Sequence, residues 1–235
     1  MKPNLRRRLT AEFLGTTLLV ATVVGSGIMA ERLANGNVAL ALLANTLATG
    51  ATLTALILTF GPISGAHFNP VVSVADGMER GLPWSEVLAY IVAQLFGGVG
   101  GTVLAHVMFS LPVVSLSHHM RSGPAQFVSE FTATFGLLCV IWGCSRFRSN
   151  VVPFAVGSYI TAAYWFTAST SFANPAVTIA RALSDTFAGI RPIDVPLFVT
   201  AQFAGGIGAT PFFRWLVPSL PSTAKDVLVR YQNDN

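Results

Sequence analysis

Two short stretches of the chain, 105 residues apart, share one unusual pattern. They are Phe68-Asn69-Pro70-Val71-Val72-Ser73-Val74-Ala75 and Ala173-Asn174-Pro175-Ala176-Val177-Thr178-Ile179-Ala180. Each is typical of a helix start, because Asn is a preferred N-cap and Pro is pre-organised for the first helical position. About ten mostly apolar or small residues follow each motif, and ten helical residues extend about 15 Å, half the hydrocarbon thickness of a bilayer. The pattern predicts two half-helices, at about 69–78 and 174–184, that meet end to end.

The repeat extends well beyond these two stretches. Ala11-Glu12-Phe13 corresponds to Ser129-Glu130-Phe131, and the segment AQLFGGVGG at 93–101 corresponds to AQFAGGIGA at 201–209. Asn-Pro alone is a common turn signal. Recurrence of the whole unit argues against two unrelated loop starts and predicts an internally repeated fold.

The composition indicates the environment of this repeat. Of the 235 residues, 52% are apolar and only 10% are charged, whereas charged residues make up about a quarter of an ordinary soluble protein. These values predict an integral membrane protein. No signal-peptide cleavage pattern precedes the first apolar run, so we interpret that run as a permanent helix.

Six segments are long enough to cross a bilayer, at about 9–30, 38–60, 84–109, 125–145, 151–170 and 195–217. Each half of the chain contributes three of them and one half-helix. Because three is odd, the second half must enter the membrane upside down, which gives an inverted repeat. The prediction is an all-α membrane protein with six transmembrane helices and two re-entrant half-helices. It forms a single domain over 1–235, with repeats at about 9–109 and 125–217 and a cytoplasmic tail at 218–235.

The distribution of basic residues predicts the orientation. With the N-terminus inside, six crossings leave Arg32, Arg121, Arg181 and Arg191 outside and the other ten of the 14 Lys and Arg residues on the cytoplasmic side. This asymmetry satisfies the positive-inside rule. We therefore expect a multi-pass protein of the cell inner (plasma) membrane with both termini in the cytoplasm.

Several polar residues fall within or beside the predicted spans. Glu12 and Glu130 occupy matching positions, and a carboxylate within a span is costly unless it is paired or hydrogen-bonded. We expect a structural role, in which each holds the loop amides before a half-helix; a proton relay is the alternative. His67 is expected to line a pore near its cytoplasmic mouth, with gating by protonation as the alternative.

The sequence offers little for catalysis or cofactors. Cys139 and Cys144 are interpreted as small buried residues, and His118 and His119 as solvated loop residues, so neither a metal site nor a cofactor is predicted. There is no nucleophile–base set, which argues against an enzyme. The basic residues lie at segment ends, which argues against a nucleic-acid partner.

The half-helix tips predict what such a membrane protein does. The carbonyl oxygens of Asn69 and Asn174 can cap their own helices, which leaves the amide NH₂ groups as donors toward a pore. Two converging helix N-termini carry positive partial charge, which disfavours cations and interrupts proton conduction. We therefore expect a passive channel that favours neutral hydroxylated solutes.

In combination, these motifs resemble the aquaporin and aquaglyceroporin family, the major intrinsic proteins, over residues 9–217. The resemblance implies one pore per subunit, assembled as a homotetramer in the lipid bilayer. It places two Asn-Pro-Ala motifs at the pore midplane, here Asn69, Pro70 and Val71, and Asn174, Pro175 and Ala176. The first motif departs from the family by ending in Val71 instead of Ala.

The second departure concerns the narrow selectivity filter. The family usually has Arg directly after the second motif, where this chain has Val177. Spacing from the motifs assigns Thr49, Tyr164 and Ser171 to the other filter positions, although the segment before Asn174 is about two residues shorter than usual. This filter is uncharged and predicts weaker exclusion of charged species. Arg181, one helical turn beyond Val177, is expected in the outer vestibule, paired with Asp185.

The filter also bears on the solute. Bacterial members with a similar Arg-less filter are associated with arsenic resistance, so arsenite and methylated arsenicals are the preferred prediction, with glycerol or water as the alternative. An ion-coupled secondary transporter and a non-conducting adhesion or scaffold protein remain competing interpretations.

Overall fold

The structure is a computed structural model that describes residues 3–217; the predicted tail at 218–235 lies outside the described residues. Within the described part, the regular structure is helical. The α-helices are α1 (Leu5–Leu33), α2 (Val38–Ser64), α3 (Pro70–Met78), α4 (Trp84–Met108), α5 (Pro124–Phe147), α6 (Val152–Phe166), α7 (Pro175–Arg181) and α8 (Val195–Leu216). Two short 3₁₀ turns, Ser149–Val151 and Pro192–Asp194, precede α6 and α8.

Six long helices and two half-helices form the predicted bundle. Helices α1, α2, α4 and α5 meet both the length and the hydropathy expected of a membrane span within the described residues. The predicted span at 151–170 is helical only as far as Phe166, because the chain becomes extended at Thr167 and must return to the middle of the bundle to start α7.

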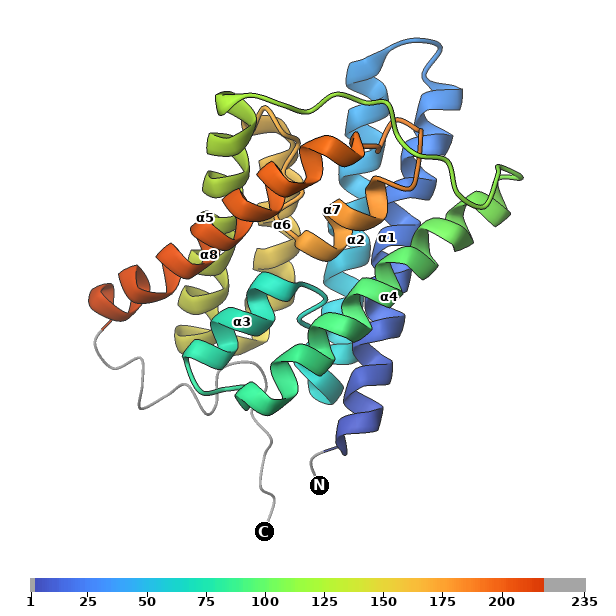
Figure 1. Ribbon diagram of the computed structural model, residues 1–235. Coiled ribbons are helices and arrows are strands. Elements are labelled where there is room, and N and C mark those ends of the chain that lie inside the picture. Colours follow the sequence, from blue (N-terminus) through green and yellow to red (C-terminus); the bar gives the residue numbers. More distant parts are fainter. Residues whose placement is uncertain (1–2, 218–235) are drawn as a thin grey trace.

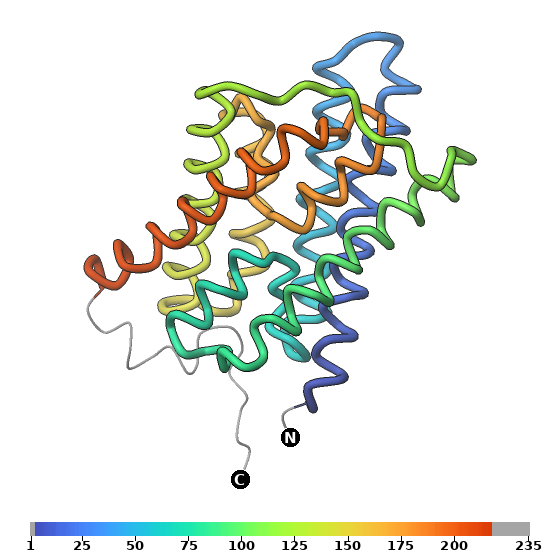
Figure 2. Tube along the Cα trace, in the orientation of Figure 1, coloured from blue at the N-terminus to red at the C-terminus, as the bar shows by residue number. Residues whose placement is uncertain are grey.

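The two half-helices enter the bundle from opposite ends. We call the end at which α1 begins the amino end and the opposite one the far end. In Figure 1, α3 occupies the half of the bundle near the amino end and α7 the half near the far end. Figure 2 shows the same inversion along the trace, with α1 and α5 running in opposite directions. The first half of the chain, with α1, α2, α3 and α4, is therefore the inverted counterpart of the second half, with α5, α6, α7 and α8.

Close helix packing holds each half together. Helix α1 packs on α4, and α5 packs on α8 in the same way. At Gly97 an added Cβ would lie 2.5 Å from the carbonyl oxygen of Phe13, and at Gly205 it would lie 2.5 Å from that of Phe131. Such distances exclude any side chain, so both positions require glycine for the backbones to approach.

The outside of the bundle is apolar. Large side chains such as Leu47, Leu88 and Phe96 are 55%, 70% and 67% exposed. In water such a surface would drive aggregation, but in a bilayer it contacts lipid tails. Several buried polar residues, among them Glu12, Gln94, Glu130 and Gln202, instead lie inside the bundle around the loops that precede α3 and α7.

Candidate functional site

The two loops that precede the half-helices have the same strained backbone. Ala66 and Phe68 adopt φ of 51° and 48°, and Ser171 and Ala173 adopt φ of 48° and 49°. These pairs are related by the 105-residue offset of the sequence repeat. A non-glycine residue in this region costs about 1–3 kcal/mol and persists only where its surroundings enforce it. The repetition indicates that both loops are held by equivalent groups.

Glu12 and Glu130 are the groups that hold these loops. The Glu12 carboxylate accepts hydrogen bonds from the backbone N–H groups of His67 (3.0 Å) and Phe68 (2.7 Å). The Glu130 carboxylate accepts from those of Phe172 and Ala173, both at 2.9 Å. These are the loop-amide contacts expected from the sequence. The structural role of the two glutamates remains a prediction, tested below.

Gln94 and Gln202 complete the two networks. The Gln94 amide donates to Glu12 (2.8 Å) and to the Ser73 hydroxyl (2.9 Å). The Gln202 amide donates to Glu130 (2.6 Å) and to the Thr178 hydroxyl (2.8 Å). Each network thus ties two long helices, a loop and a half-helix together. The sequence repeat marked both glutamines, but it did not reveal that they contact the glutamates.

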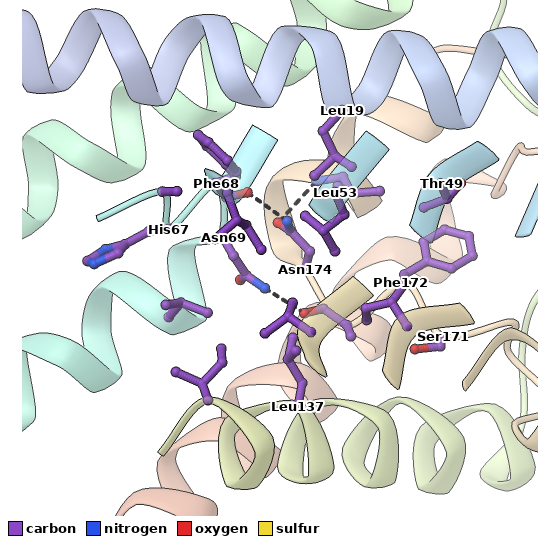
Figure 3. Close-up of a pocket in the computed structure, with 18 of the residues that line it drawn as sticks. Leu19, Thr49, Leu53, His67, Phe68, Asn69, Leu137, Ser171, Phe172 and Asn174 are labelled. Carbon is purple, nitrogen blue, oxygen red and sulfur yellow. Dashed lines mark hydrogen bonds between the residues drawn. The ribbon is translucent and has the colours of Figure 1, made fainter. Parts of the chain in front are cut away.

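Asn69 and Asn174 meet at the tips of the half-helices, where their side chains cross between the two halves. Each Oδ1 caps its own helix, accepting from Val71 N and from Ala176 N, both at 2.9 Å. Each Nδ2 donates to the opposite loop, Asn69 to the Ala173 carbonyl and Asn174 to the Phe68 carbonyl, both at 2.7 Å (Figure 3). One of the two N–H groups of each amide is therefore used, and one remains for a ligand.

A narrow cavity of about 80 Å³ passes these asparagines. In Figure 3 it runs across the view from His67 on one side, past Asn69 and Asn174, to Thr49 and Ser171 on the other. Leu19, Leu53 and Leu137 surround the asparagines (Figure 3), so the middle of the cavity is apolar apart from the two amides.

The four positions assigned to the filter come together on the far-end side of the cavity. Thr49, Tyr164, Ser171 and Val177 all line it. The Tyr164 hydroxyl donates to Thr49 Oγ1 at 3.3 Å, and the buried Ser171 Oγ has no hydrogen-bond partner in the described part of the chain. The four side chains thus line the same cavity, and their assignment to one filter remains a prediction.

His67 lies at the other side of the cavity, toward the amino end. Its Nδ1 is 3.0 Å from the Ser73 hydroxyl, and its Nε2 is 3.5 Å from the carboxylate of Asp76. Asp76 is a buried acidic residue that sequence reasoning missed. Its position seven residues after Asn69, two helical turns into α3, was the available signal.

The structure corrects the expected position of Arg181. This residue is only 2% exposed and lines the same cavity as Val177, instead of lying in an open vestibule. Its Nε donates to the Ala188 carbonyl, and its guanidinium carbon lies 3.3 Å from the centroid of the Phe172 ring. The expected ion pair with Asp185 is wrong: α7 ends at Arg181, so Asp185 is not on the helix where an i,i+4 pair would form.

Asp185 has a different partner. Its carboxylate accepts from the backbone N–H of His118 and lies 2.9 Å from the ring Nδ1 of the same residue. The backbone and side-chain hydrogen bonds from His118 hold the pKa of Asp185 below its usual range. This contact ties together two exposed loops at the far end.

Transmembrane helices, two half-helices that meet tip to tip and a narrow cavity past their tips define a membrane channel for small solutes. The chain belongs to the major intrinsic protein family, which matches residues 1–173.

Relatives with similar sequences or folds carry related names. Aquaglyceroporin AqpS of Rhizobium meliloti is 54% identical over 219 residues, covering 93% of this chain and 94% of the relative. The glycerol uptake facilitator protein of Streptococcus pneumoniae is 29% identical over 65% of this chain and 71% of its own length. The solved aquaglyceroporin of Plasmodium falciparum has the same fold, with a TM-score of 0.70 at 20% identity over 92% of this chain and 99% of that one.

Proposed function

We propose that this protein conducts arsenite and methylated arsenicals passively down their gradients, with glycerol or water as the alternative solutes. The observation that supports conduction most directly is the crossed pair of Asn69 and Asn174 in the otherwise apolar middle of the cavity. A solute that passes them finds one free N–H on each amide. It must therefore carry oxygen acceptors and be able to shed its water.

The same geometry opposes charged species. Helices α3 and α7 point their N-termini at the middle of the cavity, where their dipoles give positive partial charge. A cation there would lose its hydration and meet this charge, and a file of water would be interrupted as a proton path. Neutral hydroxylated molecules suffer neither penalty.

The choice of arsenite rests on its chemistry and on the filter. Arsenite is neutral near pH 7 and presents three hydroxyl groups, so it resembles a small polyol. The proposed ring of Thr49, Tyr164, Ser171 and Val177 contains no charge. Val177 also occupies less space than the arginine usual in the family, which suits a solute bulkier than water. The facilitator named for glycerol uptake supports glycerol as the second candidate.

The proposal includes a setting in the cell. A single channel domain with both termini in the cytoplasm of the inner membrane agrees with the charge asymmetry of the sequence. One chain encloses the cavity, which fits one pore in each subunit. We infer a homotetramer from the family resemblance.

Flux into proteoliposomes tests the proposal. We expect uptake of arsenite and glycerol that saturates weakly and does not depend on ion gradients, and we expect Asn69→Ala and Asn174→Ala to lower it at equal protein content. Strict dependence on an ion gradient would favour a secondary transporter. Flat permeability for every solute would favour a scaffold protein. An arsenate reductase or arsenic-responsive repressor encoded beside this protein would support arsenite over glycerol.

A further inference from the structure

Arg181 is the one cationic side chain, among the described residues, that lines the cavity. It lies four residues after Val177 on α7, so it is about 6 Å closer to the far end. A solute that enters from that end reaches Arg181 before the uncharged ring. From the sequence we expected this charge in the outer vestibule, whereas in the structure the Arg181 side chain lines the cavity.

The guanidinium is fixed in place but is not neutralised. Its Nε donates to the Ala188 carbonyl, and the group lies over the Phe172 ring, which in turn packs edge-on against Phe198 with ring centroids 5.0 Å apart. A cation over an aromatic face is stabilised without losing its charge. No carboxylate pairs with Arg181 in the described part of the chain, because Asp185 contacts His118 instead.

The remaining donors of Arg181 point to a ligand. Neither Nη atom has a hydrogen-bond partner in the part of the chain that the structure describes. Both atoms nevertheless keep some accessible surface. Since the residue is 2% exposed and lines the cavity, the accessible surface of these atoms faces the passage. Most buried side-chain donors in proteins have a protein or water partner, so Nη groups that face the passage without one are available to a solute.

We propose that Arg181 replaces the missing filter arginine from one helical turn farther out, so that the filter has two tiers. The outer tier is cationic and offers the Nη donors to the oxygens of neutral hydroxylated solutes. The inner tier, with Val177, is uncharged and leaves room for a bulky solute after it has passed the charge. This inference rests on the proposed channel function, and it replaces the expectation of weak charge exclusion, which required Arg181 to lie in the vestibule.

The main test compares the parent with Arg181→Gln in proteoliposomes. Potassium and proton leak are measured with ion-sensitive dyes, and glycerol flux is measured on the same vesicles. We expect a leak about tenfold higher in the variant, equivalent to losing about 1.4 kcal/mol of electrostatic barrier. Glycerol flux should remain measurable but should change relative to water flux, because the solute loses the Nη donors. The half-helix dipoles should limit any further leak.

Two results of that test would overturn the inference. One is a parent that already leaks cations, and the other is an Arg181→Gln variant that stays as tight as the parent while conducting glycerol. A parent that conducts neither glycerol, water nor arsenite would instead contradict the proposed function and would leave the accessibility test below to decide on Arg181.

Thiol labelling tests accessibility independently of selectivity. A membrane-impermeant, cationic methanethiosulfonate reagent should label both Arg181→Cys and Asp185→Cys, but only modification of the former should block flux, since Asp185 is outside the cavity lining. The parent, with Cys139 and Cys144, measures background labelling. An unlabelled Arg181→Cys beside a labelled Asp185→Cys would place Arg181 away from the passage and refute the proposal.

A conservative variant covers the case in which neutral replacements fail to assemble. Arg181→Lys keeps the charge but lacks the planar fork of donors. We expect unchanged cation exclusion and a glycerol-to-water flux ratio altered at least about twofold, because the solute loses its paired donors. An unchanged ratio would show that the Nη groups do not contact the solute.

Discussion

Val177 stands where the family resemblance leads us to expect an arginine. Its side chain lines the same cavity as Tyr164 and Ser171. An arginine there would add a fixed positive charge and five donors. Valine adds neither, and it occupies less space. The width and the polarity of this ring therefore depend on one substitution.

Replacing Val177 by Arg should narrow the inner ring. We expect Val177→Arg to lose bulky hydroxylated solutes first, methylated arsenicals before glycerol, and to retain water. Arg181 lies one turn away, so the second guanidinium also adds like-charge repulsion along α7. Stopped-flow light scattering with a series of solutes measures the change.

Val177→Leu is the matched control, because it adds bulk without charge. It should reduce large-solute flux less than Val177→Arg does. If Val177→Arg passes large and small solutes in the parental ratio, Val177 does not line the constriction and the filter assignment is wrong.

The half-helices are too short to hold their own positions. Helix α3 has 9 residues and α7 has 7, and helices of this length are marginal in isolation. Their tips are fixed instead by the two glutamate networks and by the crossed asparagines. Helices α1 and α5 therefore act as rigid supports for loops whose backbone would otherwise relax.

Substitutions of Glu12 and Glu130 should show whether these residues have a structural role or relay protons. Glu12 accepts four hydrogen bonds and Glu130 accepts three, all from buried donors. Each buried donor left unpaired costs about 1–3 kcal/mol. We expect Glu12→Ala and Glu130→Ala to reduce assembly, measured as the monodisperse fraction in detergent.

Glutamine keeps one acceptor oxygen, so Glu12→Gln and Glu130→Gln should assemble better than the alanine variants. Their flux should be nearly independent of pH. A glutamine variant that assembles normally but loses a pH-dependent flux would instead support the proton-relay interpretation.

Val71, the departure in the first motif, is accommodated by a glycine on another helix. An added Cβ at Gly206 would lie 2.0 Å from Val71 Cγ1, so α3 and α8 approach closely there. We expect Gly206→Ala to cost about 1–3 kcal/mol by overpacking, measured as a lower thermal midpoint. The double variant Val71→Ala, Gly206→Ala should recover much of this loss.

Gly208 provides the control on the same helix. An added Cβ there meets nothing within 4 Å, so Gly208→Ala should be neutral or slightly stabilising. Equal destabilisation by Gly206→Ala and Gly208→Ala would contradict the packing argument.

The whole passage is built from a single chain. Residues of both repeats line it, from His67 through the two asparagines to Arg181. The inverted arrangement is what allows this, since it brings two half-helices from opposite ends to one point. Assembly into a tetramer would therefore multiply the pores and would not create them.

Mixing active and inactive subunits tests this independence. We expect glycerol flux to fall in direct proportion as the parent is replaced by the double variant Asn69→Ala, Asn174→Ala at constant total protein. Native mass spectrometry reports the subunit number in the same samples. A fall much steeper than proportional would mean that a pore is shared between subunits.

Much of the fold and part of the site follow from residue order alone. The 105-residue repeat predicts two half-helices, and three spans in each half require inversion, because an odd number of crossings reverses the direction of the chain. The caps at Asn69 and Asn174 follow from local chemistry, since the Asn-Pro pair carries its own helix-start signal. The loop amides bound by Glu12 and Glu130 could be expected because a buried carboxylate needs donors.

Other features required the tertiary structure. Helical spacing placed Arg181 on the same face as Val177, but the end of α7 at Arg181 removed its expected partner Asp185. The Phe172 ring and the Ala188 carbonyl, which come from the loops on either side of α7, hold the guanidinium in the cavity wall. Likewise, the bonds of the asparagine amides to opposite loops join residues 104 and 106 positions apart. The direction of a buried polar side chain depends on the acceptors that distant segments bring to it, and only the packed chain supplies them.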